Sequence, residues 1–182
     1  MVATTSSYEK NDFRKDFFEI ISKIQPELIV EFGIGNGYSL QSWIDFTGNN
    51  CEIHCYDLFD DFPYHHASYD KIKSIINESS RVCVEKLDFY KGVDRYADGQ
   101  IDLLHIDIAN NGDTFQFAFE NYLNKISDKG VMIFEGGSTE RDNVYWMSKF
   151  NKRKINPYLM EVKDKYNIQI IEKYPSLTIV KK

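Results

Sequence analysis

A glycine-rich segment preceded by a carboxylate is the strongest chemical signal in the sequence. Its acid is Glu31, and its glycines are Gly33, Gly35 and Gly37. Glycines allow a tight turn and a close approach to a ligand, because they carry no Cβ atom. A helix starting at Tyr38 and Ser39 would present free N–H groups to a carboxylate or phosphate. The segment predicts a ligand-binding turn, with a plain strand-to-helix connection as the alternative.

The spacing of the glycines separates this turn from two common nucleotide sites. A dinucleotide-binding fingerprint, G-x-G-x-x-G, needs its third glycine at position 38, which is Tyr38. No Gly-Lys-Ser/Thr sequence follows, so a P-loop is excluded. What remains is G-x-G-x-G with a leading acid.

Acidic residues also end the next two predicted strands. Asp57 and Leu58 close the second strand, where a carboxylate can accept both hydroxyls of a ribose. Asp88 and Phe89 close the third, offering an acceptor for an exocyclic amine and an aromatic face for a purine. Because parallel strands end at one edge of a sheet, we expect these acids and Glu31 to line one crevice.

Apolar patterns predict the strands that position these residues. Strands are expected at residues 28–32, 51–58, 82–87, 101–108 and 131–134, with helices between them. Such alternation favours right-handed βαβ units and a parallel sheet. Residues 168–171 and 177–180 are too close in sequence for a helix to join them, so they predict an antiparallel hairpin at the sheet edge. The predicted fold is α/β: a doubly wound, mostly parallel seven-stranded sheet with helices on both faces.

Apolar residues at helical spacing predict the helices. The first, carrying Phe13, Phe17, Ile20, Ile21 and Ile24, should stop at Pro26. Asp113 is expected to cap a helix that carries apolar residues as far as Ile126. The sequence Thr-Glu-Arg-Asp at 139–142 is interpreted as a capping box that opens a helix through Phe150.

Composition limits the kinds of partner. The 182 residues include 22 Lys and Arg against 28 Asp and Glu, a net charge of −6, which argues against nucleic-acid binding. No apolar run is long enough to span a membrane, and no signal peptide is recognised. Cys51, Cys55 and Cys83 are predicted to be reduced core thiols. We expect a cytoplasmic protein with a single domain over residues 1–182, residues 1–26 being its N-terminal helical segment.

Over roughly residues 25 to 182, these features resemble the class I S-adenosylmethionine-dependent methyltransferases. The resemblance implies that S-adenosylmethionine is the cofactor and that Glu31 and the three glycines hold its methionine part. It also implies that Asp57 takes the ribose and Asp88 faces the adenine. The C-terminal antiparallel hairpin, predicted independently, is a feature of the same family.

A second motif is similar to small-molecule O-methyltransferases of the macrolide-sugar type. It reads Ile-Asp-Leu-Leu-His-Ile-Asp at 101–107 and is followed by a helix and a strand that ends in Glu135. Many relatives place Gly-Asp-His after this motif and Asp-Asp at the end of the fifth strand, which supply carboxylates for Mg²⁺. This chain has Ile-Ala-Asn at 108–110 and Glu-Gly-Gly at 135–137, so metal dependence is an open question.

Asp107 and Glu135 are the candidate catalytic residues. Either could take the proton of a hydroxyl nucleophile, alone or through Mg²⁺ bound by both, with Asn110 as a third oxygen ligand. Asp107 is also expected beside the cofactor, and the alternative is that it only orders its loop. His105 is interpreted as a core residue, and His65 and His66 as surface residues that could line a substrate lid.

The predicted function is methyl transfer from S-adenosylmethionine to a small molecule, through a hydroxyl of a sugar or secondary metabolite. Trp146 could reach the substrate, although core packing is the usual role of such a residue. The basic cluster within residues 149–154 is expected on a solvated helix end, and the alternative is that it attracts an anionic substrate such as a phosphorylated sugar. Because few residues are available to cap the site, we expect either that the acceptor is held in an open groove or that the second subunit of a homodimer closes the site. The alternatives are a non-catalytic cofactor-binding module and a nucleotide-dependent oxidoreductase on the same sheet.

Overall fold

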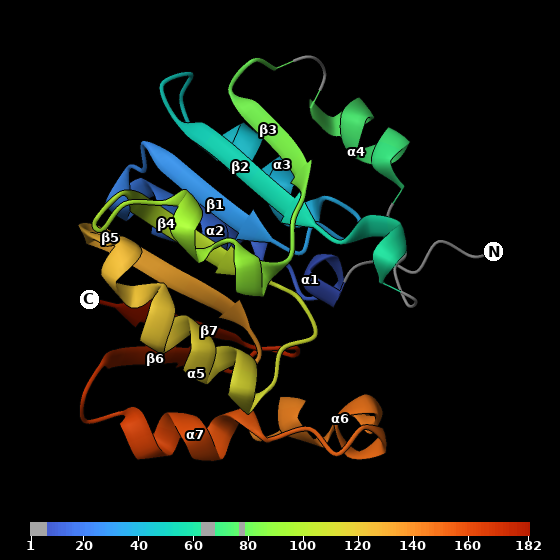
Figure 1. The fold of residues 1–182 in the computed structure, drawn as a ribbon, viewed down its shortest axis with the longest axis vertical. Coiled ribbons are helices and arrows are strands. Elements are labelled where there is room, and N and C mark those ends of the chain that lie inside the picture. Colours follow the sequence, from blue (N-terminus) through green and yellow to red (C-terminus); the bar gives the residue numbers. More distant parts are fainter. Residues whose placement is uncertain (1–6, 63–67, 77–78) are drawn as a thin grey trace.

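A computed structural model of the protein shows one seven-stranded sheet between two layers of helices (Figure 1). It describes residues 7–62, 68–76 and 79–182. The strand order is β3-β2-β1-β4-β5-β7-β6, and only β7 runs antiparallel to its neighbours. The predicted fold, including the C-terminal hairpin, is confirmed. The strands are β1 (Leu28–Phe32), β2 (Glu52–Asp57), β3 (Val82–Lys86), β4 (Ile101–Ile106), β5 (Ile126–Glu135), β6 (Asn167–Ile171) and β7 (Leu177–Lys181).

The helices divide between the two faces of the sheet. Those before β3 pack on one face, and α5 and α7 pack on the other. The α-helices are α1 (Ser7–Lys10), α2 (Arg14–Ile24), α3 (Tyr38–Phe46), α4 (Tyr69–Ile76), α5 (Gly112–Asn121), α6 (Tyr145–Lys149) and α7 (Ile155–Val162). Short 3-10 helices are η1 (Phe59–Asp61), η2 (Phe89–Lys91), η3 (Val93–Arg95), η4 (Leu123–Lys125) and η5 (Arg141–Asn143).

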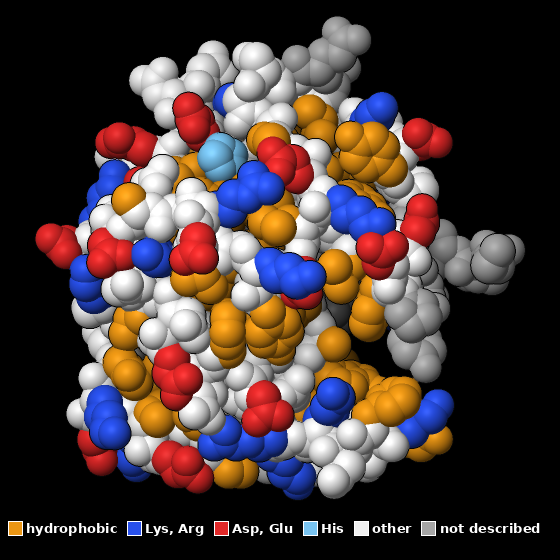
Figure 2. Space-filling view, viewed as in Figure 1, with side chains coloured by type: hydrophobic (Ala, Val, Ile, Leu, Met, Phe, Trp, Pro, Cys, Tyr) orange, Lys and Arg blue, Asp and Glu red, His pale blue; other side chains and the backbone are white. Residues whose placement is uncertain are grey.

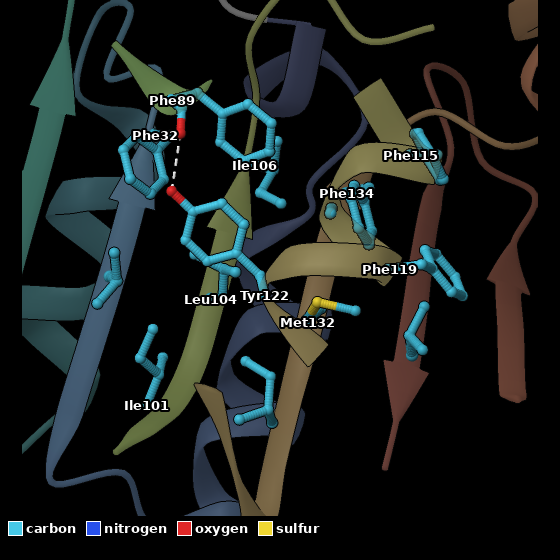
Figure 3. Close-up of a cluster of buried hydrophobic side chains, with 14 of the residues drawn as sticks. Phe32, Phe89, Ile101, Leu104, Ile106, Phe115, Phe119, Tyr122, Met132 and Phe134 are labelled. Atoms are coloured by element: carbon cyan, nitrogen blue, oxygen red, sulfur yellow. Dashed lines mark hydrogen bonds between the residues drawn. The ribbon is translucent and has the colours of Figure 1, made fainter. Parts of the chain in front are cut away.

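Aromatic rings fill the core beneath α5 (Figure 3). Phe115 stacks on Phe134 with 4.2 Å between ring centroids, and Tyr122 stacks on Phe89 at 5.1 Å. The Tyr122 hydroxyl also donates a hydrogen bond of 2.8 Å to the carbonyl oxygen of Phe89. This bond fixes the chain that follows β3, and with it the position of Asp88.

Three predictions about local structure are wrong in detail. Asn111, not Asp113, caps α5, because its side-chain oxygen accepts a hydrogen bond from the backbone N–H of Asp113. That helix ends at Asn121, and Ile126 already begins β5. Cys83 is exposed, because the edge strand β3 turns its side chain outward, whereas Cys51 and Cys55 are buried as predicted.

The predicted capping box at 139–142 does not form. Residues 141–143 make the 3-10 helix η5, and the Ser138 hydroxyl accepts the hydrogen bond from the Arg141 N–H. Asp142 instead caps α7, accepting bonds of 2.8 Å from the N–H groups of Ile155 and Asn156. The sequence pattern is local, but the partner of Asp142 lies more than ten residues away along the chain.

The part of the chain that the structure describes contains no helix long and apolar enough to cross a membrane. The cytoplasmic location stays a prediction.

The glycine turn after β1 is forced by a close approach of two backbones. Gly33 has a φ of +88°, and a Cβ atom there would overlap the carbonyl oxygen of Asp107 after β4. Gly35 also has a positive φ, +52°, but a Cβ there would meet no atom of the described residues within 4 Å. Gly33 is therefore required by packing, whereas Gly35 borders open space.

We expect Gly33→Ala to lower the free energy of unfolding by roughly 2–4 kcal/mol, from backbone strain and steric overlap together. The matched control, Gly35→Ala, should cost only about 1 kcal/mol, for its left-handed backbone. Urea unfolding of both variants measures the difference. Equal losses would show that Asp107 does not crowd Gly33.

Candidate functional site

The candidate site lies where the strand order reverses, between β1 and β4. From this point the chain continues to β2 on one side and to β5 on the other. The Asp107 N–H donates to the Phe32 carbonyl at 2.8 Å, and the Gly33 N–H donates to the Tyr56 carbonyl at 2.8 Å. Open α/β sheets bind ligands at such a reversal, beyond the carboxyl ends of the strands. Figure 2 shows the surface indented on the side toward which these strand ends point.

Asp57 joins the glycine turn to the end of β2. One carboxylate oxygen accepts from the Ile34 N–H at 2.8 Å, and the other accepts from the Phe59 N–H at 2.9 Å. The residue and its neighbour Leu58 are half-buried. The predicted ribose acid therefore stands beside the glycine turn, with its orientation fixed by two backbone bonds.

Asp88 is half-buried at the end of β3 and caps η2 by accepting from the Tyr90 N–H at 3.0 Å. Phe89 is only 3% exposed, and its ring packs in the core against Tyr122. The neighbouring aromatic ring with an exposed surface is that of Tyr90, which is 47% exposed. The structure thus places Phe89 under the predicted purine site rather than on its surface.

Glu31 and Ser39 lie beneath the glycine turn. Glu31 is fully buried, and its Oε1 atom accepts from the Ser39 hydroxyl at 2.5 Å and from the Trp43 indole N–H at 3.2 Å. His105 Nδ1 lies 2.8 Å from the same oxygen. These contacts attach the start of α3 to the central strands, so both residues hold the turn in position from below. His105 is a buried core residue, as predicted.

Tyr8 of α1 reaches this polar cluster and was not found from the sequence. Its hydroxyl lies 3.2 Å from His105 Nε2. Burial raises the pKa of Tyr8 well above its usual value, and the charges of Asp107 and Glu135 raise it further. The two partners are 97 positions apart, so no local pattern relates them.

Asp107 and Glu135 end the neighbouring strands β4 and β5. Loss of hydration and then the charge of Glu135 raise the pKa of Asp107 to about 7, against opposing contributions from His105 and Arg141. Glu135 is buried, and Arg141 binds both of its carboxylate oxygens: Nε donates to Oε1, and Nη2 donates to Oε2 at 2.7 Å. Sequence reasoning placed Arg141 in a capping box and missed this ion pair.

The loop that carries Arg141 is held by polar contacts and by two glycines. Gly136 and Gly137 have φ values of +104° and +119°, and a Cβ on Gly137 would overlap the Thr178 hydroxyl. The Arg141 guanidinium lies over the half-buried Trp146 ring, 5.2 Å from its centroid. Trp146 therefore packs beside the site.

Two buried polar atoms here have no hydrogen-bond partner among the described residues: Asn110 Oδ1 and Arg141 Nη1. The Asn110 amide donates to the carbonyl oxygens of Ile106 and Glu135, at 2.8 and 2.9 Å, and so ties the end of β4 to that of β5. Buried polar groups are nearly always satisfied, so these two atoms call for partners that the described residues do not supply, either a water molecule or a ligand.

These contacts do not fit a Mg²⁺ site formed by Asp107 and Glu135. Both oxygens of Glu135 are bound by a guanidinium, whose positive charge would repel a second cation. Nowhere in the described residues do three or more His, Cys, Asp or Glu side chains lie together as metal ligands would. His65 and His66, predicted at a lid, lie outside the described residues. The basic residues 151–154 are exposed, as expected for a solvated helix end.

Comparison with known proteins identifies the chain. Residues 30–135, more than half of it, match a family model described as a methyltransferase domain. The chain belongs to this family. It is a class I S-adenosylmethionine-dependent methyltransferase, an assignment that favours methyl transfer over the oxidoreductase alternative. No curated protein sequence matches it significantly.

Solved structures share the methyltransferase fold at low sequence identity. A candidate O-methyltransferase from Klebsiella pneumoniae has a TM-score of 0.69 and 9% identity, covering 99% of this chain and 82% of that one. A Podospora anserina methyltransferase bound to S-adenosylhomocysteine has a TM-score of 0.65 and 14% identity, and the match covers 97% of this chain and 79% of that one. A candidate rRNA methylase from Clostridium thermocellum has a TM-score of 0.65 and 16% identity, and the match covers 100% of this chain and 98% of that one.

The residues present fit S-adenosylmethionine. The first intrahelical bond of α3 runs from the Gln41 N–H to the Gly37 carbonyl, which leaves the earlier N–H groups of the helix without helical partners. Gly35 borders open space above them, where a carboxylate can approach. Asp57 and Asp88 stand farther along the same edge, in the order that a ribose and a base require.

We expect the raised pKa of Asp107 to make folding stability depend on pH. The folded protein holds a proton on Asp107 up to about pH 7, whereas the unfolded chain releases it near pH 4. Stability therefore falls as pH rises through this window. Asp107→Asn should remove this contribution to the pH dependence of stability. Measured by urea unfolding, the free energy of unfolding of the variant should therefore rise relative to that of the wild type between pH 4 and 8. Asp88→Asn is the matched control, and an unchanged slope in Asp107→Asn would contradict the assignment.

Proposed function

We propose that this methyltransferase methylates a hydroxyl oxygen of a small molecule, with Asp107 as the base that accepts the hydroxyl proton. The observation that carries the proposal is the position of Asp107. Its backbone lies at the strand reversal, one residue beyond β4 and against Gly33. Burial and the charge of Glu135 raise the pKa of its carboxyl group to about 7. A base with a pKa near the working pH can take a proton and release it again.

The residues along the strand ends have separate roles in this proposal. Gly33, Gly35, Gly37 and the N-terminus of α3 receive the amino-acid part of S-adenosylmethionine, and Asp57 and Asp88 receive its ribose and adenine. When bound, the cofactor supplies a methyl group carried on a sulfonium. The chain aligns the acceptor oxygen with that methyl group and excludes water from the reacting atoms. Asp107 takes the proton as the new C–O bond forms.

A small acceptor is favoured over a nucleic acid by charge. The chain has a net charge of −6, and the candidate site contains more acidic than basic side chains. Phosphate backbones are bound by the opposite arrangement. The similarity to the candidate rRNA methylase, at 16% identity, shows a shared fold and gives no information about the acceptor. A sugar or secondary-metabolite hydroxyl therefore stays our proposed acceptor, and a homodimer that closes the site stays a proposal as well.

Cofactor binding should be selective and should depend on Asp57. We expect S-adenosylhomocysteine to raise the melting temperature through mass action, and NAD and ATP to leave it unchanged. Asp57→Ala should weaken S-adenosylhomocysteine binding by on the order of 1–3 kcal/mol in calorimetry, because hydroxyls would lose their acceptor. Asp128→Ala, an exposed carboxylate near the start of β5, is the control. Stabilisation by NAD alone would overturn the cofactor assignment.

Turnover should depend on Asp107 more than cofactor affinity does. With a panel of sugars and phenols as acceptors, release of S-adenosylhomocysteine should fall roughly 100-fold or more in Asp107→Asn. The affinity for S-adenosylhomocysteine should change little, because the lost interaction belongs to proton transfer. If amines are methylated and hydroxyls are not, or if the variant keeps full turnover, the proposed base is wrong.

A further inference from the structure

Building on the proposed function, we propose that Arg141 does the work of a catalytic metal ion in this enzyme: its Nη1 group donates a hydrogen bond to the acceptor oxygen, and turnover needs no divalent cation. The geometry assigns Arg141 this place because it binds both oxygens of Glu135, a candidate metal ligand, and its Nη1 group has no hydrogen-bond partner among the described residues. The acceptor class that fits is an uncharged alcohol or phenol.

Two of the three nitrogens of the guanidinium group donate hydrogen bonds to Glu135, and the third has no partner among the described residues. Nε and Nη2 bind the two oxygens of Glu135, while Nη1 is buried without a hydrogen-bond partner in the described chain. Arg141 as a whole is 4% exposed. An unpaired donor on a buried cation is costly, and a bound oxygen atom would satisfy it.

The arginine is held rigidly, as a positioning residue must be. The Ser138 hydroxyl accepts from the Arg141 N–H, and Asp142 next to it is anchored by two backbone N–H groups of α7. Trp146 covers one side of the guanidinium. A donor fixed before the substrate arrives needs no reorganisation during the reaction, which is the main advantage that a bound metal would also give.

The other orphaned atom completes a site for a hydroxyl group. Asn110 Oδ1 is an acceptor and Arg141 Nη1 is a donor, and a hydroxyl group can both donate and accept. The Glu135 carboxylate already neutralises the charge of Arg141, which favours an uncharged ligand.

Metal binding tests the inference without needing an acceptor. Titration of the full chain with Mn²⁺, followed by electron paramagnetic resonance, should show no specific site in the wild type at millimolar metal. Arg141→Met leaves Glu135 and Asp107 without the guanidinium and should create a Mn²⁺ site, while Arg141→Lys should not. Arg153→Met, which removes an exposed arginine, is the matched control. A Mn²⁺ site in the wild type, or none in folded Arg141→Met, would overturn the inference.

Turnover gives a second and independent measurement. With any acceptor that the wild type methylates, EDTA should leave the rate unchanged, and Arg141→Lys should lower kcat/KM by on the order of 100-fold with S-adenosylhomocysteine affinity preserved. Loss of wild-type activity in EDTA would overturn the inference even if the methionine variant failed to fold. Failure of the wild type to bind S-adenosylhomocysteine would instead refute the proposed function, so the two failures are distinguishable.

Discussion

The contact between Gly33 and the backbone of Asp107 is the constraint on which the site depends. Two neighbouring parallel strands end at this point, and the chain leaving β1 must pass directly over the residue leaving β4. Only a glycine with a positive φ fits there. The same contact places the glycine turn, the predicted cofactor-binding segment, next to Asp107, the proposed base. One steric requirement therefore brings these two parts of the candidate site together.

Around this contact lies an unusual amount of buried charge. Glu31 gathers Ser39, Trp43 and His105 beneath the glycine turn, and Glu135 pairs with Arg141 beyond β5. Buried charges are expensive unless they are paired and hydrogen-bonded, and replacing a buried ion pair with apolar residues is often neutral or stabilising. Stability alone therefore does not explain the Glu135–Arg141 pair, which is consistent with the role proposed for Arg141 at the acceptor.

The loop after β5 brings an arginine back to the carboxylate that ends the strand. Gly136 and Gly137 follow Glu135, and the backbone there turns with positive φ against Thr178 and Ile155. That turn carries Arg141 back over the end of β5, onto the Glu135 carboxylate. Asn110, in the loop after β4, ties β4 to β5 through its amide. The ends of both strands are therefore held by polar side chains of this chain.

The sequence by itself determined the strands, the hairpin, the glycine turn and the acids at the strand ends, because these follow from local periodicity and from glycine's backbone freedom. It also indicated one ligand crevice, since the acids must share one edge once the strands are parallel, and the resemblance to class I methyltransferases then implied the cofactor. Only the tertiary structure decided that Phe89 faces the core, that Tyr8 meets His105, and that Arg141 holds Glu135. Those outcomes depend on side chains that meet across the fold or across a turn, and local patterns such as the Thr-Glu-Arg-Asp sequence at 139–142 do not show which distant group will compete for them. The Asp142 carboxylate accepts hydrogen bonds from the start of α7 rather than from its own turn, and these bonds help to position the neighbouring Arg141.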